Sequence, residues 1–317
     1  MASAVFFKIA AAITFFLSST LASPLQSRSI DSSTFANLEL FEQFAAAAYC
    51  PGNNNITNGG TKLTCPVSNN CPLVEADDVT TVYEFQNNCS SLLTDVTGYI
   101  AVDNTRSLTI LAFRGSESVR NFLADADFPT IPTDICSGCE ADQGFYNSWL
   151  EARTGVMSAL KSAAAANPSY QVVVVGHSLG GAIAAIAAAE LRDQGTNTDL
   201  YTYGQPRIGG STISNYITNQ NKGGNFRVTH YDDPVPRLPP LLLGFVHISP
   251  EYYIDTGNYI PVTAADIKEL TGSINLLGNT VNIGDGVDLD AHGWYFNNIS
   301  SCDTSDSLEF KRAIISG

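Results

Sequence analysis

The chain has 317 residues, of which 44% are hydrophobic, and its formal net charge at pH 7 is −15. This length and composition suffice for one large apolar core, and the acidic balance excludes nucleic acid as a partner and disfavours binding to anionic membranes. Seven cysteines are typical of a chain that folds in an oxidising compartment. We therefore expect a secreted, extracellular protein.

The N-terminus predicts export. Lys8 precedes a mostly apolar run that ends near Leu17, and Thr20-Leu21-Ala22 provides a cleavage site of small residues. The run is too short for a membrane span, which needs about 20 apolar residues. We predict a signal peptide over residues 1–22, a pro-segment over 23–28 that ends at Arg28, and one domain over 29–317.

Hydrophobic periodicity predicts alternating helices and strands in the mature chain. In chain order we expect a helix over 33–49, strands over 97–103 and 107–114, a helix over 149–166, a strand over 170–176, a helix over 180–194, a strand over 199–204, a helix over 210–219, a strand over 226–229 and a helix near 264–270. Beyond Pro234 we expect little other regular structure. The pattern predicts a single-domain α/β fold with a mostly parallel central sheet and helices on both faces.

Gly176-His177-Ser178-Leu179-Gly180 is a G-x-S-x-G motif between a buried strand and a buried helix. A serine in such a sharp turn is exposed to substrate, and the glycines on either side let the strand and helix approach each other. The motif alone is common, and its non-catalytic interpretation is a tight glycine turn. Its position between strand and helix favours Ser178 as a nucleophile.

A serine hydroxyl needs a base, and the base needs an acid to orient it. Asp232 and Asp233 stand where a predicted strand breaks at Pro234, and of the two we predict Asp233 as the acid. His292 lies on a polar loop and is the predicted base. The alternative, His247, has apolar neighbours, which are more typical of a core histidine.

Ser116 follows a predicted strand end, Phe113-Arg114-Gly115. The non-catalytic interpretation is a strand entering a loop. The functional one is that the backbone N–H groups of Ser116 and Leu179 form an oxyanion hole.

The motifs GHSLGGA, AFRGSES, CSGC, VTHYDDPVPRLPP and AHGWYF occur in the order found in secreted fungal class 3 lipases. The chain resembles that family from about Phe35 to Cys302. The resemblance implies an α/β-hydrolase fold, a triad of Ser178, Asp233 and His292, and the same oxyanion hole. It also implies an enzyme that needs no cofactor or metal and acts on neutral lipid at a lipid–water interface, with no stable protein partner.

The resemblance further implies a helical lid after Ser116, where Val119, Phe122 and Leu123 have helical spacing. A permanently packed surface helix is the alternative. Close relatives often have tryptophan at the position of Phe122, which weakens the expected lid anchoring. The apolar run after Pro240 suggests an acyl-binding wall, although core packing explains it equally well; its residues are Leu241, Leu242, Leu243 and Phe245.

By analogy with the family, the disulfides are Cys50–Cys302, Cys65–Cys71 and Cys136–Cys139, which leaves Cys89 without an assigned partner. Three sequons predict N-glycans on a secreted chain; their asparagines are Asn55, Asn88 and Asn298.

The loop that contains Asp285, Asp288 and Asp290 lacks the glycine and glutamate of an EF-hand. We therefore predict that it is a solvated loop and binds no metal.

The sequence thus predicts a secreted triacylglycerol lipase with a Ser-His-Asp triad and an acyl-enzyme. A feruloyl-type esterase or a phospholipase on the same fold is the alternative, because fold does not settle substrate. A non-catalytic lipid-binding relative is disfavoured because all three triad residues are present.

Overall fold

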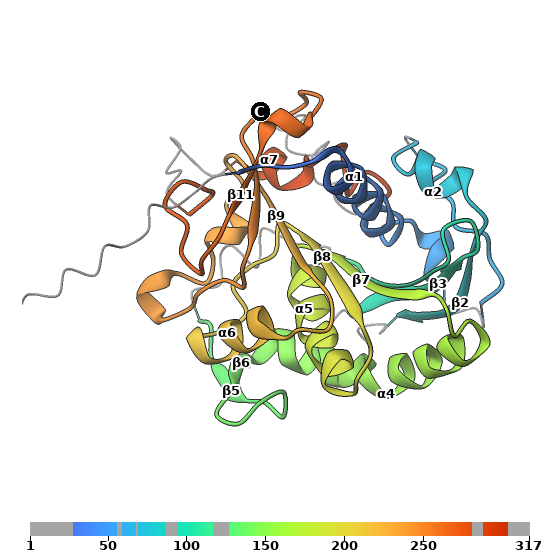
Figure 1. Ribbon diagram of the computed structural model, residues 1–317, viewed down its shortest axis with the longest axis horizontal. Helices are drawn as coiled ribbons and strands as arrows, with labels where there is room; N and C mark the ends of the chain where they lie inside the picture. Colours follow the sequence, from blue (N-terminus) through green and yellow to red (C-terminus); the bar gives the residue numbers. More distant parts are fainter. Residues whose placement is uncertain are drawn as a thin grey trace, which may run out of the picture.

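The computed structural model describes residues 28–55, 59–67, 69–86, 94, 96–116, 127–280 and 288–303. In these residues a nine-stranded sheet runs through the centre, and helices cover both of its faces (Figure 1). The predicted single-domain α/β fold with a central parallel sheet is confirmed. The signal peptide and pro-segment lie outside the described residues except for Arg28, so they stay predictions.

The large sheet has the order β1-β11-β10-β9-β8-β7-β4-β3-β2. Its five central strands, from β10 to β4, pair in parallel, and the outer strands on both sides pair antiparallel. The strands are β1 (Arg28–Ser29), β2 (Val79–Gln86), β3 (Thr97–Asp103), β4 (Leu108–Phe113), β7 (Gln171–His177), β8 (Thr198–Tyr203), β9 (Asn225–His230), β10 (Glu251–Ile254) and β11 (Ile267–Leu270). A separate hairpin contains β5 (Thr130–Pro132) and β6 (Glu140–Asp142).

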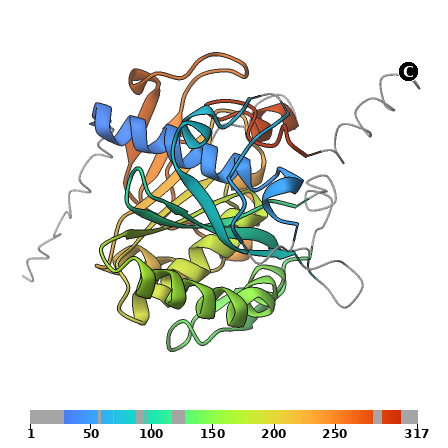
Figure 2. The ribbon, with the colours of Figure 1, turned by 90° about the vertical axis from the view of Figure 1, so that its right-hand side faces the viewer.

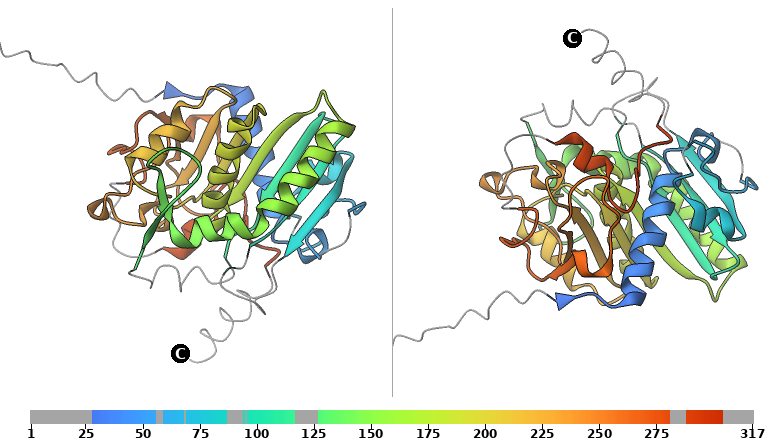
Figure 3. Two further views of the ribbon diagram at one scale, coloured as in Figure 1. Left: turned by 90° about the horizontal axis from the view of Figure 1, so that it is seen from below. Right: turned by 90° about the horizontal axis from the view of Figure 1, so that it is seen from above.

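The helices divide between the two faces of the sheet. Helix α1 lies on one face, and α4 and α5 lie on the other (Figure 2). The α-helices are α1 (Ser32–Ala47), α2 (Pro72–Ala76), α4 (Gln143–Ala166), α5 (Leu179–Asp193), α6 (Ser211–Asn219) and α7 (Leu289–Gly293). Short 3-10 segments are η1 (Pro51–Asn53), η2 (Val235–Arg237), η3 (Leu241–Leu243) and η4 (Ala264–Asp266). Seen from above, α1 and α7 lie on the same side of the molecule (Figure 3).

The valine run of β7 explains why both faces need a cover. Val173 and Val175 pack toward α1, while Val172 and Val174 pack toward α4 and α5. Because side chains alternate along a strand, an unbroken apolar run is typical of a strand buried on both faces. Helix α5 is apolar on nearly all sides for the same reason, since its alanines are buried against β7, β8 and α4.

Two segments differ from the predicted elements beyond Pro234. The helix expected near 264–270 is instead a 3-10 turn, η4, followed by strand β11. Alanine, lysine, glutamate and leucine favour a helix there, but antiparallel pairing with β10 outweighs that propensity. Strand β10 was also not predicted, so this region contains more regular structure than its glycines and prolines suggest.

Two further differences concern the ends of the sheet and the start of α4. Strand β2 was not predicted, because its polar side chains and the register shift between Thr81 and Tyr83 obscure the alternation. Helix α4 begins at Gln143, six residues before the predicted start, because the Asp142 side chain accepts hydrogen bonds from the N–H groups of Gly144 and Phe145. Within the described ranges, no helix is both long and apolar enough to cross a membrane.

Candidate active site

Ser178 stands in a strained turn between β7 and α5. Its φ of 56° is in the left-handed region, which non-glycine residues rarely adopt. A Cβ added to Gly176 would lie 2.3 Å from the Gly180 carbonyl oxygen, and a Cβ added to Gly180 would lie 2.3 Å from the Phe113 carbonyl oxygen. The two glycines therefore allow the close approach that holds the serine at the top of the sheet.

The loop after β4 lies against this turn. A Cβ added to Gly115 would be 3.0 Å from the Cβ of Ser178, so Ser116 follows a backbone that contacts the serine. Leu179 is the first residue of α5, where the helix dipole favours negative charge. The two predicted oxyanion donors thus belong to the two backbone segments next to Ser178.

Asp233 and His292 meet at the same end of the sheet. Asp233 follows the end of β9, and His292 lies in the short helix α7, whose first turn is capped by the Asp288 side chain. The Nδ1 atom of His292 lies 3.0 Å and 2.9 Å from the two carboxylate oxygens of Asp233. Both side chains are buried. Since a carboxylate accepts, Nδ1 carries the proton, and the neutral ring has its basic nitrogen at Nε2.

The Asp233 carboxylate has further donors. The hydroxyl of Tyr295 donates at 2.5 Å and the backbone N–H of Val235 donates at 2.9 Å. Burial alone raises the pKa of Asp233, but the charge and hydrogen bond of His292, with these two donors, outweigh burial and lower the pKa. The carboxylate therefore stays ionised. Sequence reasoning missed Tyr295, although the AHGWYF motif contains it.

His177 links the base to the turn that holds the serine. Its ring centroid lies 4.5 Å from that of His292, and its Nε2 donates to the carbonyl oxygen of His292 at 2.9 Å. Its Nδ1 therefore accepts from the hydroxyl of Tyr49 at 2.6 Å. Burial lowers the pKa of His177 to about 3, helped by the nearby His292 charge, so His177 stays neutral.

His292 keeps one nitrogen available. Its Nε2 is buried and has no hydrogen-bond partner among the residues that the structure describes. This atom is on the opposite edge of the ring from Asp233. A hydrogen bond between a catalytic base and its nucleophile often tightens only when substrate is bound. The arrangement can therefore take a proton from a hydroxyl at Nε2.

The rejected candidates have other partners. The carboxylate of Asp232 pairs with Arg237 at 3.3 Å. The Nε2 of His247 donates to the Pro236 carbonyl oxygen at 2.7 Å, and burial lowers the pKa of His247 well below its ordinary value. His230 contacts the carbonyl oxygens of Ala291 and Thr256. In the described part of the chain, the Asp233 carboxylate accepts from His292, Tyr295 and Val235 and not from these three side chains.

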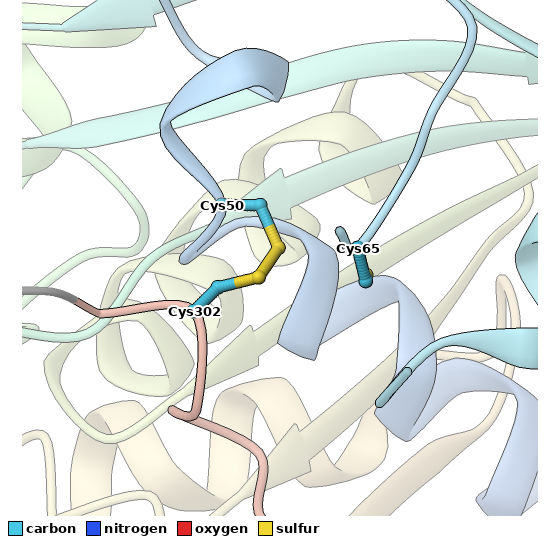
Figure 4. A group of neighbouring side chains, drawn as sticks. All are labelled: Cys50, Cys65 and Cys302. Carbon is cyan, nitrogen blue, oxygen red and sulfur yellow. A yellow bond between two sulfur atoms is a disulfide. The ribbon is translucent and has the colours of Figure 1, made fainter. Parts of the chain in front are cut away.

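The structure contains the three disulfides implied by the resemblance. Figure 4 shows the Cys50–Cys302 bond beside Cys65, and the three sulfur atoms lie within 4.8 Å of one another. Cys65 is bonded to Cys71, so these sulfurs are not the thiolates that a metal site requires. Cys89 lies outside the described residues.

The acidic loop and the sequons are described in part. Asp288 caps α7 and accepts from the Asn258 amide at 2.7 Å, which gives it a structural role, whereas Asp285 lies outside the described residues. Asn55 and Asn298 are exposed, as glycan acceptors must be, and Asn88 lies outside.

The predicted lid lies outside the described residues, whereas the predicted acyl wall lies within them. Val119, Phe122 and Leu123 lie outside the described residues. Leu242 is 95% exposed and Leu243 is 54% exposed, so these two side chains are not part of the core. Their neighbours Pro240 and Gly244 place them in a surface 3-10 turn. Phe245 is buried. A role in acyl binding stays a prediction for all four residues, Leu241, Leu242, Leu243 and Phe245.

Comparisons with known proteins identify the family of this chain. The family described as "Lipase (class 3)" matches residues 110–243, and "Lipase 3 N-terminal region" matches residues 9–92. The secreted mono- and diacylglycerol lipase A of Penicillium cyclopium is 45% identical over 91% of this chain and 92% of its own length.

Solved structures show the same fold. The mono- and diacylglycerol lipase of Aspergillus oryzae has a TM-score of 0.80 at 41% identity, covering 86% of this chain and all of its own. A triacylglycerol lipase whose catalytic centre is described as a serine protease triad has a TM-score of 0.73 at 28% identity, covering 87% of this chain and all of its own. The predictions of an α/β-hydrolase fold, a serine ester hydrolase and a secreted location are confirmed. By its site and by these matches, the chain belongs to the class 3 lipase family.

Proposed function

We propose that this lipase hydrolyses acylglycerol esters with Ser178 as nucleophile, His292 as base and Asp233 as the acid that orients the base. The observation that carries the proposal is the buried contact between Nδ1 of His292 and both oxygens of Asp233. In the neutral ring, the proton on Nδ1 leaves the lone pair of Nε2 beside the turn that holds the serine. The three residues are far apart in sequence, and a structural role would not require this combination of burial, charge and free nitrogen.

The reaction has two stages. His292 takes the Ser178 hydroxyl proton at Nε2 while Oγ attacks the ester carbonyl carbon, and the carbonyl oxygen becomes an oxyanion that accepts from the N–H groups of Leu179 and Ser116. The C–O bond to glycerol then breaks, and the leaving oxygen takes the proton from His292. Water gives a proton to His292, attacks the acyl carbon and releases a fatty acid, and the proton returns to Ser178.

The substrate class follows from the relatives. We propose that mono- and diacylglycerols are hydrolysed faster than triacylglycerols, because relatives that share 41–45% identity are named for the partial glycerides. A triacylglycerol lipase matches at 28% identity. Triacylglycerol therefore remains a substrate in the proposal, with a lower rate.

Contact with a neutral lipid surface is part of the proposal. Leu242 and Leu243 expose apolar surface, which a lipid phase would remove from water. The net charge of −15 opposes binding to anionic lipid. The proposal also includes a signal peptide over 1–22, N-glycans, and a lid that contains Val119, Phe122 and Leu123.

The lid is tested by measuring the hydrolysis rate against tributyrin concentration. A sharp rise in rate at the solubility limit supports the lid, and smooth saturation below that limit contradicts it.

The catalytic proposal is tested by titrating the fatty acid released from emulsions of monoolein, diolein and triolein. We expect the partial glycerides to react faster, and Ser178→Ala to lower every rate by about 10⁴-fold or more. Retained turnover in Ser178→Ala refutes the nucleophile. Faster hydrolysis of methyl ferulate than of any acylglycerol contradicts the substrate class and favours the feruloyl-type alternative.

A further inference from the structure

Asn279 is a buried amide that contacts the turn carrying Asp233. Its side chain is 1% exposed. Its Nδ2 donates to the backbone carbonyl oxygen of His230 at 2.8 Å and to that of Asp233 at 2.9 Å. Carbonyl oxygens only accept, so the amide nitrogen must face them. Asn279 therefore bridges both ends of the turn in which β9 ends and the carboxylate begins.

Asn279 is itself held from the other side. Its backbone N–H donates to Glu251 Oε1 at 3.2 Å, and Glu251 is a buried residue of β10. The hydroxyl of Thr229 donates to the same oxygen at 2.6 Å. A Cβ added to Gly278 would lie 2.6 Å from Glu251 Oε2, so only glycine lets the loop approach this carboxylate. The backbone of Asn279 is thus held against the central sheet, while its side chain contacts the turn.

Between residues 230 and 233 the described structure contains one backbone–backbone hydrogen bond. The Asp233 N–H donates to the His230 carbonyl oxygen at 3.2 Å, a long bond that shares its acceptor with Asn279. The Asn279 bond to the Asp233 carbonyl crosses 46 residues of sequence. A displacement of about 1 Å in a catalytic group can cost about 10²-fold in rate, so such a bridge matters for the carboxylate that it places.

We propose that Asn279 is a positioning residue, which holds the backbone of Asp233 so that the carboxylate meets Nδ1 of His292. This inference rests on the proposed triad. Asn279 acts through Asp233 and touches neither substrate nor the reacting atoms. Glu251 and Asn279 together connect the catalytic acid to strand β10, which pairs with β9 in the sheet.

Asn275 provides a matched control. It lies in the same loop, is 2% exposed, and its Nδ2 donates to the other Glu251 oxygen at 2.8 Å. Among the described residues, its side chain makes no hydrogen bond to the 230–233 turn; its second acceptor is the Leu270 carbonyl oxygen. Removing either side-chain amide deletes buried hydrogen bonds, but those of Asn275 go to Glu251 and the Leu270 carbonyl, whereas those of Asn279 go to the turn.

The experiment measures kcat and KM on a soluble short-chain ester for Asn279→Ala and Asn275→Ala, with thermal unfolding of each. We expect Asn279→Ala to lower kcat by about 10- to 100-fold with KM within about twofold, and Asn275→Ala to lower the Tm similarly but leave kcat within about twofold. Asn279→Leu, which keeps the number of side-chain heavy atoms but has no donor, replaces the alanine variant if that variant does not fold, and the same fall in kcat is expected.

Equal kcat values in the Asn279 and Asn275 variants overturn the positioning role. Asp233→Ala in the same assay separates this result from a failure of the proposed function. If Asp233→Ala keeps full kcat, then Asp233 is not the catalytic acid and both proposals fall. If Asp233→Ala loses activity while the Asn279 variants keep it, only the positioning role is refuted.

Discussion

The burial of His177 allows a prediction of how the free energy of unfolding depends on pH. Because burial lowers its pKa to about 3 from an ordinary value near 6.5, the folded protein keeps it neutral while the unfolded chain protonates it below pH 6.5. Between pH 6.5 and pH 3 the unfolded state binds a proton at His177 that the folded state does not bind. The free energy of unfolding therefore decreases as the pH falls through this range. Between pH 7 and pH 5 the loss is about 2 kcal/mol.

The perturbation is His177→Gln, which removes the titrating group. Urea unfolding at pH 7 and pH 5 gives the free energy of unfolding of the variant and the wild type. We expect the variant to be less stable at pH 7, since it loses the hydrogen bonds to Tyr49 and His292, but its loss between the two pH values should be smaller by about 2 kcal/mol.

The control is Val156→Ala, a buried apolar change in α4 that lowers stability equally at both pH values. It should leave the difference between pH 7 and pH 5 as it is in the wild type. If His177→Gln also leaves that difference unchanged, then His177 is not a neutral buried histidine and the reasoning from its burial is wrong.

Three further predictions concern the site and the surface. Tyr295→Phe removes a donor to Asp233, and initial rates on a soluble ester should show kcat lower by about tenfold with KM unchanged; a kcat within twofold contradicts this. Gly176→Ala places a Cβ 2.3 Å from a backbone oxygen of α5 and should reduce the free energy of unfolding by about 3 kcal/mol, whereas Gly52→Ala, with open space around it, should not. Exchanging Leu242 and Leu243 for serine should weaken adsorption to a neutral-lipid emulsion by about tenfold per leucine, with the rate on a soluble ester unchanged as the check.

The fold was predictable where one physical signal dominates. The valines of β7 and the alanines of α5 lie in a fully buried setting, and such runs identify the centre of the sheet. Strand β11 was not predictable from its own residues, because its partner β10 decides its conformation. Local propensity fails where long-range pairing determines the structure.

The candidate site could be predicted as far as its chemistry has a motif. The G-x-S-x-G turn and the break after β9 point to Ser178 and Asp233, and a polar loop points to His292. Tyr295, Tyr49 and Asn279 could not be assigned from the sequence, because a buried hydroxyl or amide that contacts a carboxylate, a ring nitrogen or a backbone carbonyl is recognised only when the chain is folded. The sequence therefore indicates the reacting groups better than the groups that hold them.

The bond between Cys50 and Cys302 joins positions 252 residues apart and so encloses nearly all of the catalytic domain in a covalent ring. A protease that cuts one peptide bond anywhere inside that ring produces two pieces that stay attached. The nicked enzyme would migrate as a single band on a non-reducing gel and separate into fragments only after a reducing agent is added. For a protein released among extracellular proteases, a surface loop can be cut without loss of either half.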